Sequence, residues 1–418
     1  MELGRDWLKV IFSNGLAGIK PCIPVSFDLL QLEASKKLSK KAFDYIFTGA
    51  GTNLGVTNNR EAFKRYRIKP HMLQGCENPS LETQIFNNRF PLPFYFSPIG
   101  VLELAHLNAD LELAIAAKNT GLTMIYSNQA SKSMETCSSL LGTSNKWFQL
   151  YFSKSRELVE SLVSRAEQNG CTALVLTLDT TTIGWRVMDL ENAYLPFIYG
   201  KGLAQYTSDP VFNKLMNSNK HNTPTKSVSN RPGFFDTLEI LKSYPDTLLN
   251  NLKTGNSVKA IRCFFDLYSN PDLSWDDITW LRTITKLPIV LKGILHEEDA
   301  RKALDSGIDG IIVSNHGGRQ IDQVFSSLDA LRQIKKILPS SYPLLFDSGI
   351  RSGTDIFIAL ALGAKAIGIG RPYVYALALK GHVGVETLVQ NLASELMITM
   401  SLCGCKSIET ITSDLLTD

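Results

Sequence analysis

The stretch with the clearest chemical potential is residues 314–322, which read S-N-H-G-G-R-Q-I-D directly after the apolar run 310–313. A run of that length and branching is typical of a strand buried on both faces, so the polar stretch begins where the strand would leave its sheet. His316 offers a base near neutral pH, and Arg319 can clamp an anion. The glycines between them allow a ligand to approach the backbone closely. The alternative is a capped strand-to-helix loop with a solvated histidine and arginine.

The sequence contains eight apolar runs with strand character, one of which leads into this stretch. They occupy residues 93–97, 122–127, 147–152, 173–179, 288–292, 310–314, 343–347 and 366–370. Segments with helical spacing of apolar residues separate most of them, at 110–119, 155–169, 297–306, 327–338 and 354–362. Eight strands that alternate with helices predict an α/β fold, a (β/α)8 TIM barrel.

Polar side chains gather where these runs end, whereas the runs begin mostly with proline, glycine or alanine. Active sites of such barrels lie at the carboxyl ends of the strands, so Asp179 and Lys292 are expected beside His316. Taken singly, Asp179 could be a turn carboxylate and Lys292 a lysine that extends to solvent. The polar residues at the run ends are Ser127, Tyr151, Asp179, Lys292, His316, Asp347 and Arg371.

Two glycine-rich turns follow the seventh and eighth runs. Residues 347–353 read D-S-G-I-R-S-G and residues 368–372 read G-I-G-R-P. Barrels commonly bind phosphate at these positions through backbone N–H groups. Asp347, Gly349 and Arg351, with Gly370 and Arg371, therefore indicate a phosphorylated cofactor. The alternative is a pair of tight turns that carry surface arginines.

Two parts of the sequence do not follow the alternation of strands and helices. Residues 1–30 contain Pro21 and Pro24 and predict an arm with little regular structure, followed by one helix over residues 30–47 with Tyr45 in its last turn. A polar insert, residues 187–262, follows the fourth strand and predicts a loop that forms a lid over the mouth of the barrel, with a mobile middle at 214–231. We expect a single domain over residues 1–418.

Composition excludes several classes of partner. The 418 residues carry a net charge of +3, which is too small and too dispersed to indicate a nucleic-acid partner. No apolar window is long enough for a membrane span, and the amino terminus lacks a charged region followed by an apolar one as in a signal peptide, which predicts a cytoplasmic protein. The seven cysteines have no paired C-x-x-C spacing, so we expect neither a disulfide framework nor a metal site.

From about Tyr45 onward the sequence resembles the FMN-dependent 2-hydroxy-acid oxidases and dehydrogenases. The signature is S-N-H-G-G-R-Q at 314–320, supported by Q-L-Y at 149–151, L-T-L-D-T at 176–180, L-K-G at 291–293 and G-R-P at 370–372. Within that family, G-W-R at 184–186, D-L-E-N-A-Y-L-P-F at 189–197 and Y-T-S-D-P-V-F at 206–212 are most similar to lactate 2-monooxygenases. Those enzymes convert L-lactate and O2 to acetate, carbon dioxide and water.

The resemblance implies roles residue by residue. His316 would be the base that acts on the hydroxy acid, with Asp179 orienting its ring and Lys292 facing flavin N1. The substrate carboxylate and its 2-hydroxyl would be held by Tyr45, Tyr151, Arg186 and Arg319. The cofactor FMN would contact Pro98, Ile99, Gly100, Ser127, Gln149, Thr177, Lys292, Ser314, Asp347, Gly349, Arg351, Gly370 and Arg371.

Other activities stay open at this point. An oxidase would release keto acid and H2O2, a dehydrogenase would pass electrons to a quinone or cytochrome, and a flavin-binding barrel would not react at all. Many relatives carry tryptophan where this chain has Gln129, which leaves the preferred 2-hydroxy acid open. The resemblance also implies a homo-oligomer, either a tetramer or an octamer.

Overall fold

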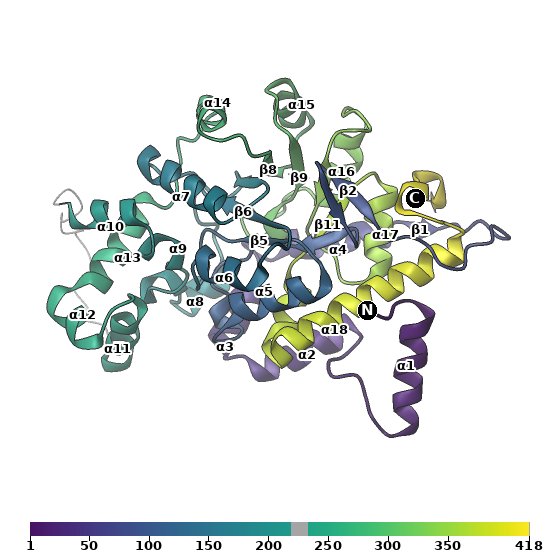
Figure 1. Ribbon diagram of the computed structural model, residues 1–418, viewed down its shortest axis with the longest axis horizontal. Coiled ribbons are helices and arrows are strands. Elements are labelled where there is room, and N and C mark those ends of the chain that lie inside the picture. The colour runs from purple at the N-terminus through teal and green to yellow at the C-terminus, as the bar shows by residue number, and fades with distance from the viewer. Residues whose placement is uncertain (219–232, 418) are drawn as a thin grey trace.

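The computed structural model describes residues 1–218 and 233–417. Its centre is a closed barrel of parallel strands in the order β10-β11-β4-β5-β6-β7-β8-β9 (Figure 1). The strands are β4 (Phe94–Phe96), β5 (Met124–Tyr126), β6 (Lys146–Leu150), β7 (Leu174–Thr177), β8 (Ile289–Ile294), β9 (Gly310–Val313), β10 (Leu344–Phe346) and β11 (Ala366–Ile369). Each overlaps one of the apolar runs, so the predicted (β/α)8 barrel is confirmed.

Helices surround the barrel (Figure 1). They are α5 (Ala109–Thr120), α6 (Met134–Leu141), α7 (Arg156–Gln168), α14 (Trp275–Ile284), α15 (Glu297–Asp305), α16 (Ser327–Lys335), α17 (Gly353–Ala361) and α18 (Arg371–Cys403). Helix α18 packs against α5 and is irregular at Lys380 and Gly381, where the backbone leaves helical geometry. Most of these helices bury one apolar face on the barrel, as the helical spacing in the sequence predicts.

The amino-terminal end of the barrel is filled. A hairpin of β2 (Thr83–Ile85) and β3 (Asn88–Phe90) places aromatic rings against Trp147, whose centroid lies 5.9 Å from that of Phe90. The side chains of Trp147 in β6 and Tyr95 in β4 are fully buried. Since this end is closed by side chains, ligands reach the barrel from the carboxyl ends of the strands.

The prediction for the amino-terminal arm is wrong in two respects. Residues 1–30 contain a full helix, α1 (Arg5–Leu16), because the two prolines lie beyond its end. The single helix predicted over residues 30–47 is two helices, α2 (Phe27–Lys37) and α3 (Lys40–Phe47). Ser39 separates them because its hydroxyl accepts a hydrogen bond from the backbone N–H of Ala42 (3.3 Å) and so caps the second helix. After α4 (Leu54–Lys64), strand β1 (Arg67–Ile68) pairs with β12 (Leu416–Thr417).

The insert after β7 is helical where the sequence predicted a loop. It holds α8 (Val187–Glu191), α9 (Ala204–Thr207), α10 (Pro210–Asn217), α11 (Phe234–Ser243), α12 (Leu248–Thr254) and α13 (Asn256–Leu267). Asp209 and Thr247 cap two of these helices, a signal that the polar composition concealed. Of the segment predicted to be mobile, residues 214–217 belong to α10, and residues 219–231 lie outside the described residues.

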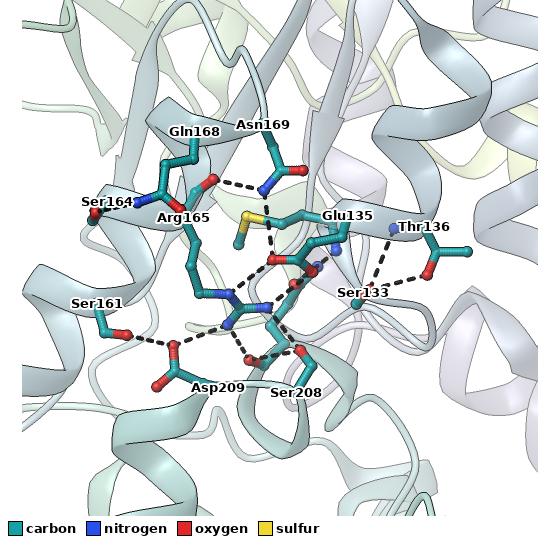
Figure 2. A network of polar contacts seen from close by, with 12 residues as sticks. Ser133, Glu135, Thr136, Ser161, Ser164, Arg165, Gln168, Asn169, Ser208 and Asp209 are labelled. Atoms are coloured by element: carbon teal, nitrogen blue, oxygen red, sulfur yellow. Dashed lines mark hydrogen bonds and ion pairs between the residues drawn. The ribbon is translucent and has the colours of Figure 1, made fainter.

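A buried arginine attaches the first half of the insert to the barrel (Figure 2). Arg165 of α7 donates to Asp209 at 2.9 Å, to Glu135 of α6 at 2.9 Å and to the hydroxyl of Ser208 at 2.7 Å. Ser161 donates a further hydrogen bond to Asp209, whose side chain is fully buried. The start of α10 therefore has a fixed position relative to the helices around β5 to β7.

Across 1–218 and 233–417, no helix is long and apolar enough to cross a membrane. The same part of the chain has no group of His, Cys, Asp and Glu side chains that could hold a metal ion.

Candidate active site

His316 and Asp179 meet at the carboxyl ends of β9 and β7. Asp179 Oδ1 lies 2.8 Å from His316 Nδ1, and the Thr180 hydroxyl lies 3.0 Å from the same carboxylate oxygen and 3.2 Å from the ring nitrogen. Because an ionised carboxylate only accepts hydrogen bonds, Nδ1 carries the proton in this contact. The second ring nitrogen, Nε2, is then free to accept a proton from a ligand.

The two side chains differ in protonation. Burial lowers the pKa of His316 below its ordinary value, although Asp179 opposes that shift. Burial alone would raise the pKa of Asp179, but the charges of His316 and Lys292 and its hydrogen bonds hold it at about 2. At neutral pH the pair is therefore a neutral imidazole next to a carboxylate, which is the state that a general base requires.

The glycines of the signature are needed for packing as well as for access. His316, Gly317 and Gly318 have φ values of 57°, 63° and 77°, which form a short left-handed turn. A Cβ on Gly318 would lie 2.5 Å from the backbone nitrogen of Val56, so α4 leaves room only for glycine there. This contact fixes the loop that carries His316 and Arg319.

Arg186 and Arg319 lie around Tyr45. Their guanidinium carbons are 5.8 Å and 4.9 Å from the centre of its ring, and all three residues line the cavity that contains His316. Burial, together with the charge of Arg186, lowers the pKa of Arg319 to about 9, so the guanidinium stays charged at neutral pH. Two such cations in one cavity favour an anionic ligand such as a carboxylate.

Tyr151 lines the same cavity, and burial raises the pKa of its hydroxyl, so it remains protonated and can donate a hydrogen bond.

Lys292, in the second half of β8, is held by side chains that follow neighbouring strands. Its Nζ donates to Ser314 Oγ at 2.8 Å and lies 3.3 Å from Asp347 Oδ2. Burial would lower the pKa of Lys292, but Asp347 and Asp179 raise it above the ordinary value. A fixed ammonium therefore faces the cavity at neutral pH.

Arg351 and Arg371 line the part of the cavity beside the two glycine-rich turns. Arg371 donates to the carbonyl oxygens of Ile46 (2.9 Å) and Gly317 (3.0 Å). Burial lowers the pKa of both arginines to about 10, so both stay charged. Together with the N–H groups of the turns, they suit a phosphate dianion.

The residues present fit FMN. Ser97 Oγ, Gln149 Nε2 and Thr177 Oγ1 are buried and have no hydrogen-bond partner among the described residues, as expected of groups that face the polar edge of a flavin. Gly368 keeps space open beside them, because a Cβ there would lie 2.3 Å from Ser97 Oγ. Lys292, Arg351 and Arg371 line the same cavity, and the two arginines would hold the phosphate.

The structure brings most of the predicted site residues to one cavity. Those that line it are Tyr45, Pro98, Ile99, Gly100, Tyr151, Arg186, Lys292, His316, Arg319, Asp347, Gly349, Arg351, Gly370 and Arg371. Five others, Ser127, Gln149, Thr177, Asp179 and Ser314, are not among the lining residues. Ser127 contacts Gln149 (3.3 Å), and Asp179 and Ser314 bond to side chains that line the cavity.

Sequence reasoning missed several members of the site. Leu195 and Phe197 from the insert, and Tyr268 after α13, also line the cavity, and no local pattern pointed to them. Thr180 and Gln320 lie inside motifs that the sequence analysis quoted but gave no role. Gln129, the position that leaves the preferred 2-hydroxy acid open, lines the cavity as well.

The chain is similar to known proteins over nearly its whole length. A family model described as FMN-dependent dehydrogenase matches residues 34–418. L-lactate oxidase of Lysinibacillus sphaericus is 37% identical over 386 residues, which cover 92% of this chain and 91% of that protein. Glycolate oxidase of Spinacia oleracea is 35% identical and covers 90% of this chain and 91% of the relative. A crystal structure of mandelate oxidase with (S)-4-hydroxymandelic acid has a TM-score of 0.77 at 31% identity, over 94% of this chain and 98% of that one.

The fold and cavity thus define a flavin-dependent oxidoreductase with a barrel scaffold. The chain belongs to the FMN-dependent 2-hydroxy-acid oxidase and dehydrogenase family, and FMN is its cofactor. It catalyses the FMN-dependent oxidation of a 2-hydroxy acid.

Proposed function

We propose that the protein is an L-lactate 2-monooxygenase, which converts L-lactate and O2 to acetate, carbon dioxide and water. The observation that carries the proposal is that side chains of the insert line part of the cavity. Leu195 and Phe197 come from the insert, yet they line the same cavity as His316. Insert side chains at the cavity can slow the exit of the first product, which supports a reaction in which that product is retained.

In this proposal the side chains bind and orient the substrate. Arg186 and Arg319 hold the carboxylate of lactate, and Tyr45 and Tyr151 donate hydrogen bonds to the carboxylate and the 2-hydroxyl. His316 Nε2 accepts the proton that leaves the substrate, and Asp179 stabilises the imidazolium that results. FMN, when bound, accepts the two electrons of the oxidation and passes them to O2, which becomes hydrogen peroxide.

Which products are released then depends on how long the keto acid stays in the cavity. Oxidation of lactate gives pyruvate, and one O2 becomes one H2O2. If both remain in the cavity, peroxide attacks the keto carbon of pyruvate, the O–O bond of the peroxide and the bond to the carboxyl carbon break, and acetate, carbon dioxide and water are formed. We propose that the insert, residues 187–262 of a single-domain enzyme, acts as a lid over the mouth of the barrel and extends the time that pyruvate is retained.

The second candidate is a lactate oxidase that releases pyruvate and H2O2. The specific observation in its favour is the 37% identity to a protein named L-lactate oxidase. The two candidates use the same cavity and the same base, and they differ only in whether pyruvate leaves before peroxide reacts with it.

Product analysis under air separates the candidates. The purified enzyme is supplied with L-lactate and catalase, which destroys only peroxide that has left the site, and acetate and pyruvate are then quantified. The proposal expects acetate as the main product. Mainly pyruvate would reassign the protein as a lactate oxidase.

We also propose that the enzyme acts in the cytoplasm as a homo-oligomer, a tetramer or an octamer, as the family resemblance implies. Light scattering coupled to size-exclusion chromatography measures the mass of the assembly directly, and a mass of 46.3 kDa, that of one chain, would contradict the proposal.

A further inference from the structure

Gln320 contacts both the loop that carries Asp179 and the guanidinium of Arg186. Its Nε2 donates to the backbone carbonyl oxygens of Asp179 (2.8 Å) and Thr182 (2.9 Å), and its Oε1 accepts from Arg186 Nη2 (2.9 Å). Gln320 is not among the residues that line the cavity, so it does not touch the substrate directly.

The orientation of this amide is fixed by its partners. Two carbonyl oxygens can only accept hydrogen bonds, so the NH2 group must face them, and the oxygen must then face the arginine. Both amide hydrogens and the amide oxygen are thereby used. A side chain held in three directions has little freedom to rotate, and it can transmit its position to Arg186.

The backbone around Gln320 is packed too closely for the contact to be incidental. A Cβ on Gly184 would lie 2.5 Å from the carbonyl oxygen of Arg319 and 2.8 Å from Gln320 Cα. The Arg319 carbonyl also accepts from Arg186 Nε at 3.2 Å. One edge of the Arg186 guanidinium, formed by Nε and Nη2, is thus bound to residues 319 and 320.

We propose that Gln320 is a positioning residue for substrate binding: it holds Arg186 by the Nε and Nη2 edge and so leaves Nη1, which lies 3.9 Å from Asp189 Oδ2, for the carboxylate site, and it fixes the strand end that carries Asp179. The inference rests on the proposed role of Arg186 in the clamp. It explains why the residue after Arg319 is an amide, since only an amide both donates to two carbonyls and accepts from an arginine.

The test is a double-mutant cycle on the FMN-loaded protein. The variants are Gln320→Met, which keeps the length of the side chain without its polar atoms, Arg186→Met, and the double variant. Oxalate serves as the probe because it carries carboxylates but no hydrogen that can be transferred. Its dissociation constant is read from the change in flavin absorbance, so no turnover is required.

Gln320→Met is expected to weaken oxalate binding roughly tenfold, the effect of one lost hydrogen bond to a charged group. In the Arg186→Met background the same change should add less than about twofold, because the residue that Gln320 holds is gone. Equal weakening in both backgrounds, or no weakening in either, would overturn the proposal. Oxalate binding by Arg186→Met at wild-type affinity would instead overturn the clamp itself.

Two controls separate positioning from general damage. Gln333→Met makes the same change on the exposed side of α16 and should leave oxalate binding unchanged. Gln320→Glu keeps an acceptor for Arg186 but brings a carboxylate oxygen against the two carbonyls. It should also weaken oxalate binding, whereas wild-type affinity in this variant would show that the contact to Arg186 alone is sufficient and would refute the two-sided role. Melting temperature and bound FMN are measured for every variant.

Discussion

Replacing Asp179 by Asn isolates the charge of Asp179 from its hydrogen bond. The asparagine oxygen can still accept from His316 Nδ1 at the 2.8 Å separation that the structure shows, so the ring keeps its orientation. The carboxylate charge that stabilises the imidazolium is removed. The variant therefore measures how much the carboxylate contributes to proton transfer.

The size of the effect follows from the burial of the pair. The side chains of His316 and Asp179 are 20% and 12% exposed, so solvent screens their interaction only in part. An opposite charge at this range typically shifts a pKa by about 1 to 3 units, or roughly 1.4 to 4 kcal/mol. Because His316 is charged after it accepts the proton, Asp179→Asn should slow the reaction by about tenfold to a thousandfold.

The assay is anaerobic stopped-flow mixing of the FMN-loaded protein with L-lactate, followed by the loss of flavin absorbance. A primary isotope effect with lactate deuterated at C2 checks that the chemical step is measured. Asp272→Asn, an exposed carboxylate on the surface, is the matched control and should react at the wild-type rate. If Asp179→Asn reduces its flavin within about threefold of wild type, Asp179 does not stabilise the imidazolium and the argument is wrong.

Four further outcomes are expected. His316→Ala should retain FMN but lose roughly a hundredfold to ten-thousandfold in the rate of flavin reduction, and a rate near that of wild type would remove it as the base. Arg186→Lys keeps the charge but loses the planar fork, so lactate should bind more weakly with FMN retained; an unchanged apparent affinity in a lactate titration would place Arg186 outside the clamp. Because the folded-state pKa of Asp179 lies below its ordinary value of 3.8, at about 2, the carboxylate stabilises the fold above about pH 4 by about 2 kcal/mol, and this contribution is lost as the pH falls from about 4 to 2. Urea unfolding of wild type and Asp179→Asn should therefore converge as the pH is lowered through that window, and a constant gap would count against the shift. Phe197→Ala should raise the ratio of pyruvate to acetate under air relative to Phe234→Ala, an exposed position in the same insert, and equal ratios would separate the insert from product retention.

The barrel was predictable because its strands are buried on both faces and polar residues lie at or just after the ends of most of the apolar runs. His316 could be found because a base, two glycines and an arginine are contiguous, and Asp179 and Lys292 could be found because strand ends meet at one edge of the barrel. The lining residues of the insert could not be found in this way. Phe197 and Tyr268 reach the cavity only through the packing of α13, where Phe197 lies 5.3 Å and Tyr268 4.9 Å from the ring centre of Phe264.

The boundaries of the helices before the barrel were harder to predict from the sequence. Helix α2 ends at Lys37, and the hydroxyl of Ser39 caps the start of α3, whereas the apolar spacing continues across the break. The roles of Gln320 and Thr180 depend on which side chain faces which carbonyl or ring nitrogen, and that information is contained in tertiary contacts rather than in residue spacing.

The Arg165 cluster determines which parts of this enzyme could be exchanged with a relative. Its guanidinium is bound to Asp209 in the insert and to Glu135 on the barrel side, and Asp209 has no exposed surface. Moving the insert alone into another barrel would leave Asp209 as an uncompensated buried charge, a cost of about 3 to 5 kcal/mol. The transplantable unit is therefore discontinuous in sequence, since α6 and α7 must supply their partners before the grafted segment can fold onto its new host.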